Sequence, residues 1–122
     1  MTWSKEQVAY FDQHDDLHIA PFRANGIAGT PTWIWSVVAD DRLFVRAYNG
    51  VHSSWYQSAL AQKAGIIVSH DEQFSVRFKH ETNETILEKI DVAYEHKYGP
   101  SPYVQAIISP KSRVTTIEIL LD

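Results

Sequence analysis

The stretch from residue 46 to residue 54 combines side chains and backbone features that suit the binding of an anion. Arg46 offers a planar fork of N–H donors that matches the oxygens of a phosphate, and Tyr48, Ser53 and Ser54 add hydroxyl groups. Asn49-Gly50 tolerates the positive φ angles of a sharp turn, and a helix that starts after such a turn presents free backbone N–H groups. The stretch is therefore a candidate cradle for a phosphate or another small anion.

Each of these features also has a purely structural interpretation. Arg46 on a strand often pairs with a carboxylate, for which Asp41 and Asp12 are candidates. Asn-Gly is most often only a turn. Trp55 and Tyr56 could flank a flat ring, but aromatic residues at helical spacing more often belong to a core or a subunit contact. The sequence leaves both interpretations open.

Other groups that carry chemistry give weaker signals. His52 lies in the same loop and is the best candidate for a general acid, although a solvated loop histidine is the simpler interpretation. His14 and His18 have i,i+4 spacing but no accompanying HExxH motif, so we expect no metal site. The chain contains neither a Gly-x-Ser-x-Gly elbow nor a P-loop. No catalytic residue is assigned.

Composition limits the class of protein. The 122 residues are 44% hydrophobic, which suits one domain over residues 1–122. A net charge of −4 with interleaved signs argues against a nucleic-acid partner. The chain has no cysteine, no apolar run of about 18 residues and no signal-peptide pattern, which favours a cytoplasmic protein without membrane contact.

The elements that must position the candidate cradle are a strand over 42–47, the Asn49-Gly50 break and a helix capped by Ser53 or Ser54. Hydrophobic periodicity and turn signals predict two more helices and six more strands. Short helices interrupt runs of hairpins, so we expect a mainly β, α+β fold: an antiparallel, barrel-like sheet of about seven strands with three flanking helices. The other helices are expected at 5–12 and 84–98, and the other strands at 17–22, 32–39, 65–70, 73–79, 103–109 and 114–121.

The segment TPTWIWSVVADDRLFVRAYNGVHSSWYQSAL followed by KAGIIV resembles the DUF2255 family of uncharacterised proteins, as does IDVAYEHKYG at residues 90–99. Residues 30–68 are also similar, more distantly, to flavin-binding split-barrel proteins: pyridoxamine-phosphate-oxidase-like enzymes and deazaflavin-dependent nitroreductases. The resemblance implies an antiparallel split β-barrel that forms a homodimer, with FMN or a deazaflavin between the subunits.

Carried over to this chain, the resemblance implies a flavin- or deazaflavin-dependent oxidoreductase, or a carrier of such a cofactor. The oxidases place an Arg-Lys pair at the start of the helix, where this chain has Ser53 and Ser54. That departure motivates the alternative of a non-catalytic module for a small anionic, phosphate-bearing ligand. The implied cofactor-binding residues are Arg46, Tyr48, Asn49, Gly50, Ser53 and Ser54 around the phosphate, with Thr30, Thr32 and the aromatic Trp55 near the ring.

Overall fold

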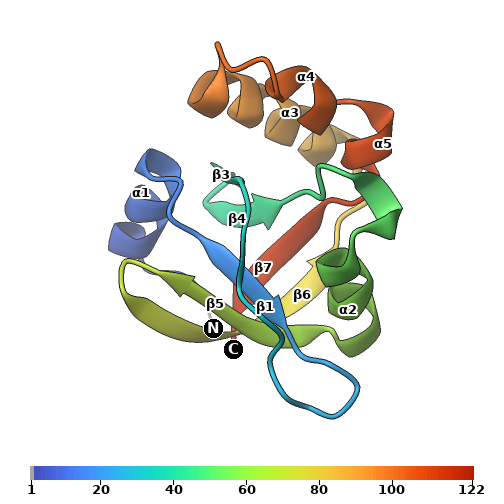
Figure 1. The fold of residues 1–122 in the computed structure, drawn as a ribbon. Coiled ribbons are helices and arrows are strands. Elements are labelled where there is room, and N and C mark those ends of the chain that lie inside the picture. Colours follow the sequence, from blue (N-terminus) through green and yellow to red (C-terminus); the bar gives the residue numbers. More distant parts are fainter. Residues whose placement is uncertain (1) are drawn as a thin grey trace.

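An antiparallel sheet of seven strands carries the fold in the computed structural model, which describes residues 2–122 (Figure 1). The strands are β1 (His18–Pro21), β2 (Thr32–Trp33), β3 (Ser36–Ala39), β4 (Arg42–Val45), β5 (Ala64–Ser69), β6 (Glu72–His80) and β7 (Ile117–Leu121). The helices are α1 (Lys5–Gln13), the 3-10 turn η1 (Gly50–His52), α2 (Ser54–Gln62), α3 (Glu84–Tyr98), α4 (Val104–Ile107) and α5 (Pro110–Arg113). None of the helices in the described part is long and apolar enough to cross a membrane.

The order of strands across the sheet is β2-β1-β5-β6-β7-β4-β3. The two edge strands, β2 and β3, are consecutive in the chain and are separated only by Ile34 and Trp35. The chain can join the two edges over such a short link only because the sheet curls round on itself, as Figure 1 shows. The expected antiparallel split barrel in an α+β fold is confirmed.

Local sequence signals explain the elements that lead to the site. Ser4 and Gln7 close a capping box at the start of α1, and the Asn83 side chain accepts a hydrogen bond from the Ile86 N–H at the start of α3. Asp40 and Asp41 both have positive φ, which is the backbone geometry of a tight hairpin between β3 and β4. The starts of α1 and α3 agree with the helices expected at 5–12 and 84–98, and the hairpin lies between the strands expected at 32–39 and 42–47.

Two expectations about strands were wrong. The predicted strand over 32–39 is divided, because β2 pairs with β1 at one edge and β3 pairs with β4 at the other. The predicted strand over 103–109 is instead the helix α4, in which the buried Val104 and Ile107 have helical spacing. The last strand begins at Ile117 rather than at 114, because α5 occupies 110–113 with Pro110 at its first turn. The described residues 2–122 therefore form five α-helices rather than three.

Helices cover the sheet on more than one side (Figure 1). One apolar cluster fills the curl of the sheet beneath α1 and α2, and includes Leu43, Val45 and Ile117. A second cluster joins β3 and β4 to α3 and α4 through Val37, Phe44, Leu87, Ile90, Tyr94 and Ile107.

Lys97 ties three of these elements together. Its ammonium nitrogen donates to the carbonyl oxygens of Phe11 on α1 and Ser36 on β3, each at 2.7 Å. Burial lowers the pKa of Lys97 to about 8, although Asp12 and Asp15 act in the opposite direction. The folded protein therefore holds this proton less tightly than the unfolded chain does.

This difference predicts a stability that rises with pH. A lysine with a folded pKa of about 8 and an unfolded pKa of about 10.4 makes the unfolded chain bind more protons between these two values. The free energy of unfolding of the wild type, relative to Lys97→Met, should therefore rise between pH 8 and pH 10 and stay flat below pH 8. Urea unfolding at a series of pH values measures it.

Lys97→Arg is the matched control, because a guanidinium keeps its charge over the whole range. Its free energy of unfolding relative to Lys97→Met should not rise in that window. If the free energy of unfolding of the wild type relative to Lys97→Met stays constant or falls between pH 8 and pH 10, burial does not lower the pKa of Lys97.

Candidate functional site

A cavity of about 690 Å³ opens where the link between the two sheet edges passes the starts of η1 and α2 and the segment around α4. This volume lies within the range usual for small-molecule sites. We call it the aromatic pocket, and define it by its lining residues: Thr32, Trp33, Ile34, Trp35, Arg46, Tyr48, Asn49, Ser53, Ser54, Trp55, Ser101, Tyr103 and Ile107.

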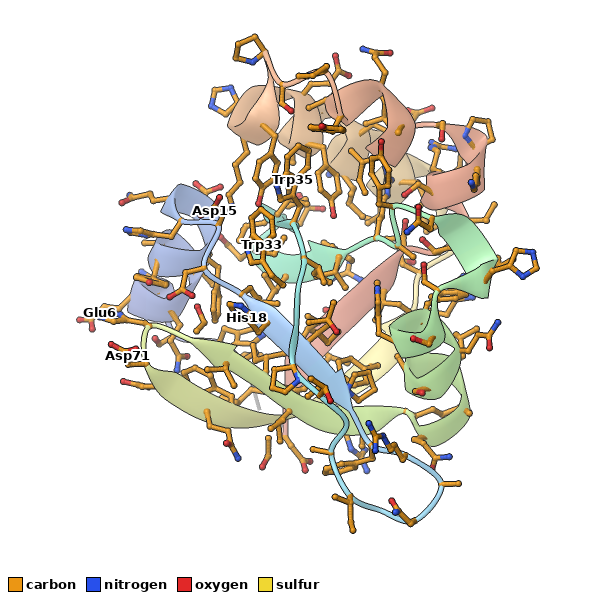
Figure 2. All side chains as sticks on the ribbon, in the orientation of Figure 1. Glu6, Asp15, His18, Trp33, Trp35 and Asp71 are labelled. Atoms are coloured by element: carbon orange, nitrogen blue, oxygen red, sulfur yellow. The ribbon has the colours of Figure 1, made fainter. Side chains whose placement is uncertain are left out.

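Five aromatic side chains give the pocket its character. Trp33 ends β2 and Trp35 lies in the link to β3; both lie between the sheet and the helices above it in Figure 2. Trp55 lies in the first turn of α2, and Tyr48 meets Tyr103 edge to face with ring centroids 6.0 Å apart. Flat, rigid walls of this kind suit a planar ring as a ligand.

Neighbouring groups fix Trp33 and Trp35. The Trp33 indole N–H donates to the Asp15 carbonyl oxygen at 2.7 Å, while 54% of the residue stays exposed. Trp35 stacks on Tyr98 with ring centroids 4.1 Å apart, and its carbonyl oxygen accepts a hydrogen bond from the Tyr94 hydroxyl. Burial raises the pKa of Tyr94, which keeps that hydroxyl a neutral donor. The aromatic wall is thus held in place before any ligand arrives.

Hydroxyl and amide groups line another part of the pocket, near the start of α2. Ser53 is the N-cap of this helix, but its side chain makes no capping hydrogen bond to the helix backbone. Ser54 and Asn49 are exposed beside it. The first backbone N–H groups of α2 have no partner within the helix, which gives this part of the pocket a weak positive potential.

Seven of the nine residues predicted as a site meet in the aromatic pocket; Thr30 and Gly50 do not line it. Gly50 is buried, and its N–H donates to the Ala47 carbonyl oxygen at 3.0 Å. A side chain at Gly50 would meet Lys111, and its φ is +79°. Gly50 therefore has a role in the fold, and its N–H is already paired with Ala47.

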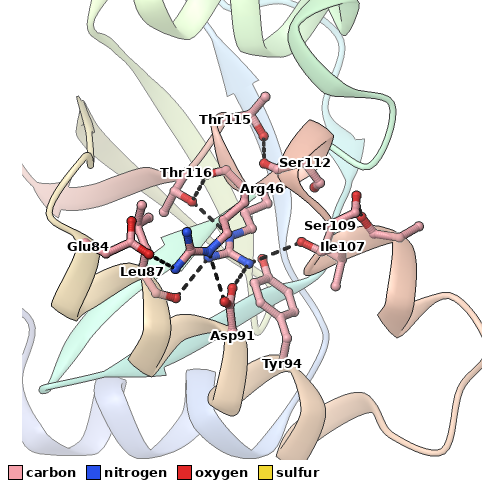
Figure 3. Close-up of polar contacts among 12 residues, drawn as sticks. Arg46, Glu84, Leu87, Asp91, Tyr94, Ile107, Ser109, Ser112, Thr115 and Thr116 are labelled. Carbon is pink, nitrogen blue, oxygen red and sulfur yellow. Dashed lines mark hydrogen bonds and ion pairs between the residues drawn. The ribbon is translucent and has the colours of Figure 1, made fainter.

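Arg46 borders the pocket, but its guanidinium is directed into the protein (Figure 3). The side chain has no exposed surface. Its Nε donates to the Thr116 hydroxyl at 2.9 Å, and Nη1 and Nη2 donate to the Ile107 and Leu87 carbonyl oxygens, each at 3.2 Å. Asp91 accepts the shortest of these bonds, at 2.5 Å from Nη1.

The carboxylate that neutralises Arg46 is Asp91 on α3, and not Asp41 or Asp12, which the sequence analysis named as candidates. Asp91 also accepts a hydrogen bond from Arg113 at 2.9 Å, and Arg113 reaches Glu84 as well. The result is a chain of alternating charges that runs from the buried Arg46 to the exposed Glu84, and every member has a partner.

These observations test how well a flavin-type group would fit. The aromatic walls and the cavity volume suit the ring system, for which Trp33, Trp35 and Trp55 would form the contact surface. The hydroxyl and amide groups at the start of α2 suit polar substituents. A phosphate fits poorly, because Arg46 is the one charged side chain that lines the pocket within the described part of the chain, and its charge is already paired.

The predicted site did not include six of the lining residues: Trp33, Ile34, Trp35, Ser101, Tyr103 and Ile107. The last three lie beside or within α4, a segment expected to be a strand. Tyr103 is 58% exposed, but exposure is not visible in a sequence.

The candidate general acid, His52, is exposed on η1 and does not line the pocket. Within residues 2–122, the structure shows no group of three metal-ligating side chains. Neither a carboxylate nor a histidine lines the aromatic pocket in the described part of the chain. The described lining residues therefore offer no carboxylate or imidazole group for acid–base chemistry.

The Arg46 network predicts a large loss of stability on Arg46→Met. The substitution removes a buried charge and leaves its acceptors without donors, so we expect the free energy of unfolding to fall by about 3–5 kcal/mol. Arg77→Met is the matched control: this side chain is 70% exposed and lies 3.5 Å from Asp122, so its removal should cost less than about 1 kcal/mol. Urea unfolding of both variants measures the difference, and equal losses would contradict the account.

Comparisons with known proteins agree with this architecture. A putative pyridoxamine 5'-phosphate oxidase from Listeria innocua has a similar structure, with a TM-score of 0.64 and 12% sequence identity over 96% of this chain and 90% of that one. A conserved hypothetical protein from Mycobacterium tuberculosis gives the same score and identity over 100% of this chain and 81% of that one. At this identity the likeness concerns the fold. None of the curated proteins matches the sequence.

The model of one protein family matches residues 7–119, which is nearly the whole chain. Its description is "uncharacterized protein conserved in bacteria", DUF2255. The chain belongs to the DUF2255 family.

Proposed function

We propose that this protein binds a planar heteroaromatic molecule of the flavin or deazaflavin class in the aromatic pocket. The observation that carries the proposal is the set of five aromatic side chains around a cavity of about 690 Å³, with hydroxyl and amide groups at one side. Such a pocket combines a large apolar contact area with a few polar groups that orient a ligand. The similarity in fold to a putative pyridoxamine 5'-phosphate oxidase supports the same class.

The chemistry of such a complex would come from the bound molecule. Flavins and deazaflavins transfer hydride themselves, and the protein contributes orientation and exclusion of water. The described lining residues suit a ligand that carries out the chemistry itself, because they supply aromatic walls and hydrogen-bonding groups but no histidine or carboxylate. An oxidoreductase role therefore rests on the ligand, and the protein acts first as its binding site.

The alternative is a non-catalytic module for a small anionic ligand. One observation favours it: Asn49, Ser53 and Ser54 surround the start of α2, where backbone N–H groups attract negative charge. The internal pairing of Arg46 with Asp91 supports the aromatic ring as the main determinant of binding instead.

Titration with riboflavin, 5-deazariboflavin and FMN tests the proposal through quenching of ligand fluorescence. We expect saturable binding of at least one of them, and about three- to tenfold weaker binding by Trp33→Ala, because a stacked aromatic contact is lost. Ile27→Ala is the matched control, since Ile27 is 63% exposed and lies outside the pocket lining.

Two results would contradict the proposal. The first is the absence of saturable binding for all three molecules. The second is an equal effect of Trp33→Ala and Ile27→Ala, which would place the ligand elsewhere on the surface.

A further inference from the structure

We infer that the aromatic pocket selects the uncharged, phosphate-free form of a flavin-type molecule over its phosphorylated form. This inference rests on the proposed function and adds the chemical class of the ligand's side chain to it. It follows from the positive charges near the pocket, which do not match the negative charge of a phosphate group.

Among residues 2–122, Arg46 is the one charged side chain that lines the aromatic pocket, and it is unavailable to a ligand. Arg46 has no exposed surface, and its guanidinium already makes four hydrogen bonds to groups on three elements or their flanks. Asp91 neutralises its charge at 2.5 Å. A phosphate could reach Arg46 only by displacing Asp91 or a backbone carbonyl group from a buried position, which would leave that group without its partner.

The next cationic side chains do not compensate. Arg113 is paired with both Asp91 and Glu84. The side chain of Lys111 packs against Gly50 and does not line the pocket, and Lys63 lies at the opposite end of α2. No full positive charge therefore faces the cavity from the described residues.

The remaining donors suit neutral oxygen atoms. Asn49, Ser53 and Ser54 offer an amide and two hydroxyl groups, and the start of α2 adds roughly half a charge. These groups can donate to the hydroxyl oxygens of a polyol side chain as well as accept from its hydroxyl groups. A phosphate near neutral pH carries between one and two negative charges, and the protein itself carries a net charge of −4. Desolvation of the phosphate would not be offset by a partner of full charge.

Riboflavin and FMN are a matched pair of probes, because they share the ring and the polyol chain and differ in one phosphate. Titration of the intact protein with each, at pH 7.5 and low salt, should give a Kd for riboflavin at least tenfold lower than that for FMN. The chain also offers a gain-of-function variant: Ser54→Arg places a cation at the start of α2, at an exposed position that lines the pocket. It should lower the ratio of the FMN Kd to the riboflavin Kd at least fivefold relative to the wild type. Ser54→Gln is the control of similar length without the charge, and should not favour FMN.

The outcomes separate this inference from the proposed function. Tighter riboflavin binding, with FMN binding improved by Ser54→Arg alone, supports the inference. Equal or tighter FMN binding by the wild type overturns it and leaves the flavin-binding proposal intact. Failure of both probes to bind overturns both.

Discussion

The packing of α3, α4 and the segment before β7 depends on the hydrogen bonds of the buried Arg46 guanidinium. An unpaired charge in that position would be highly unfavourable, so the acceptors around it must all be in place. They come from α3, from the end of α4 and from the segment before β7, which are far apart in the chain. One residue following β4 thus fixes the position of the elements that cover this side of the sheet.

The same constraint explains the character of the candidate site. Ile107 accepts a hydrogen bond from Arg46 through its carbonyl group and also lines the aromatic pocket. The hydrogen bond that positions Ile107 therefore requires the guanidinium to be directed inward, where Asp91 neutralises its charge. The second wall comes from the link between the sheet edges, where Trp35 leaves the strand pattern to stack on Tyr98. The pocket lies where the sheet closes, and Trp33 at the end of β2 and Trp35 in the link contribute two of its five aromatic side chains.

Sequence reasoning succeeds here where the signal is local. The caps at Ser4 and Asn83 and the hairpin at Asp40-Asp41 involve residues a few positions apart, and the structure has all three. It fails where distant contacts decide. The division of the strand over 32–39 depends on two different partner strands, and the burial of Arg46 depends on Asp91, which lies 45 positions away. Seven of the predicted site residues still meet in one pocket, because the strand-turn-helix unit that carries most of them is local.

The central claim is that Arg46 belongs to the internal structure and not to a ligand. NMR of the Arg46 side-chain Nε–H group tests it most directly, with assignment by comparison with an Arg46→Lys variant. The account predicts slow exchange of this proton with solvent, because the group is buried and donates to Thr116. It also predicts no shift of the resonance during titration with inorganic phosphate. Rapid exchange, or a saturable shift on addition of phosphate, would show that the guanidinium is open to anions and would contradict the account.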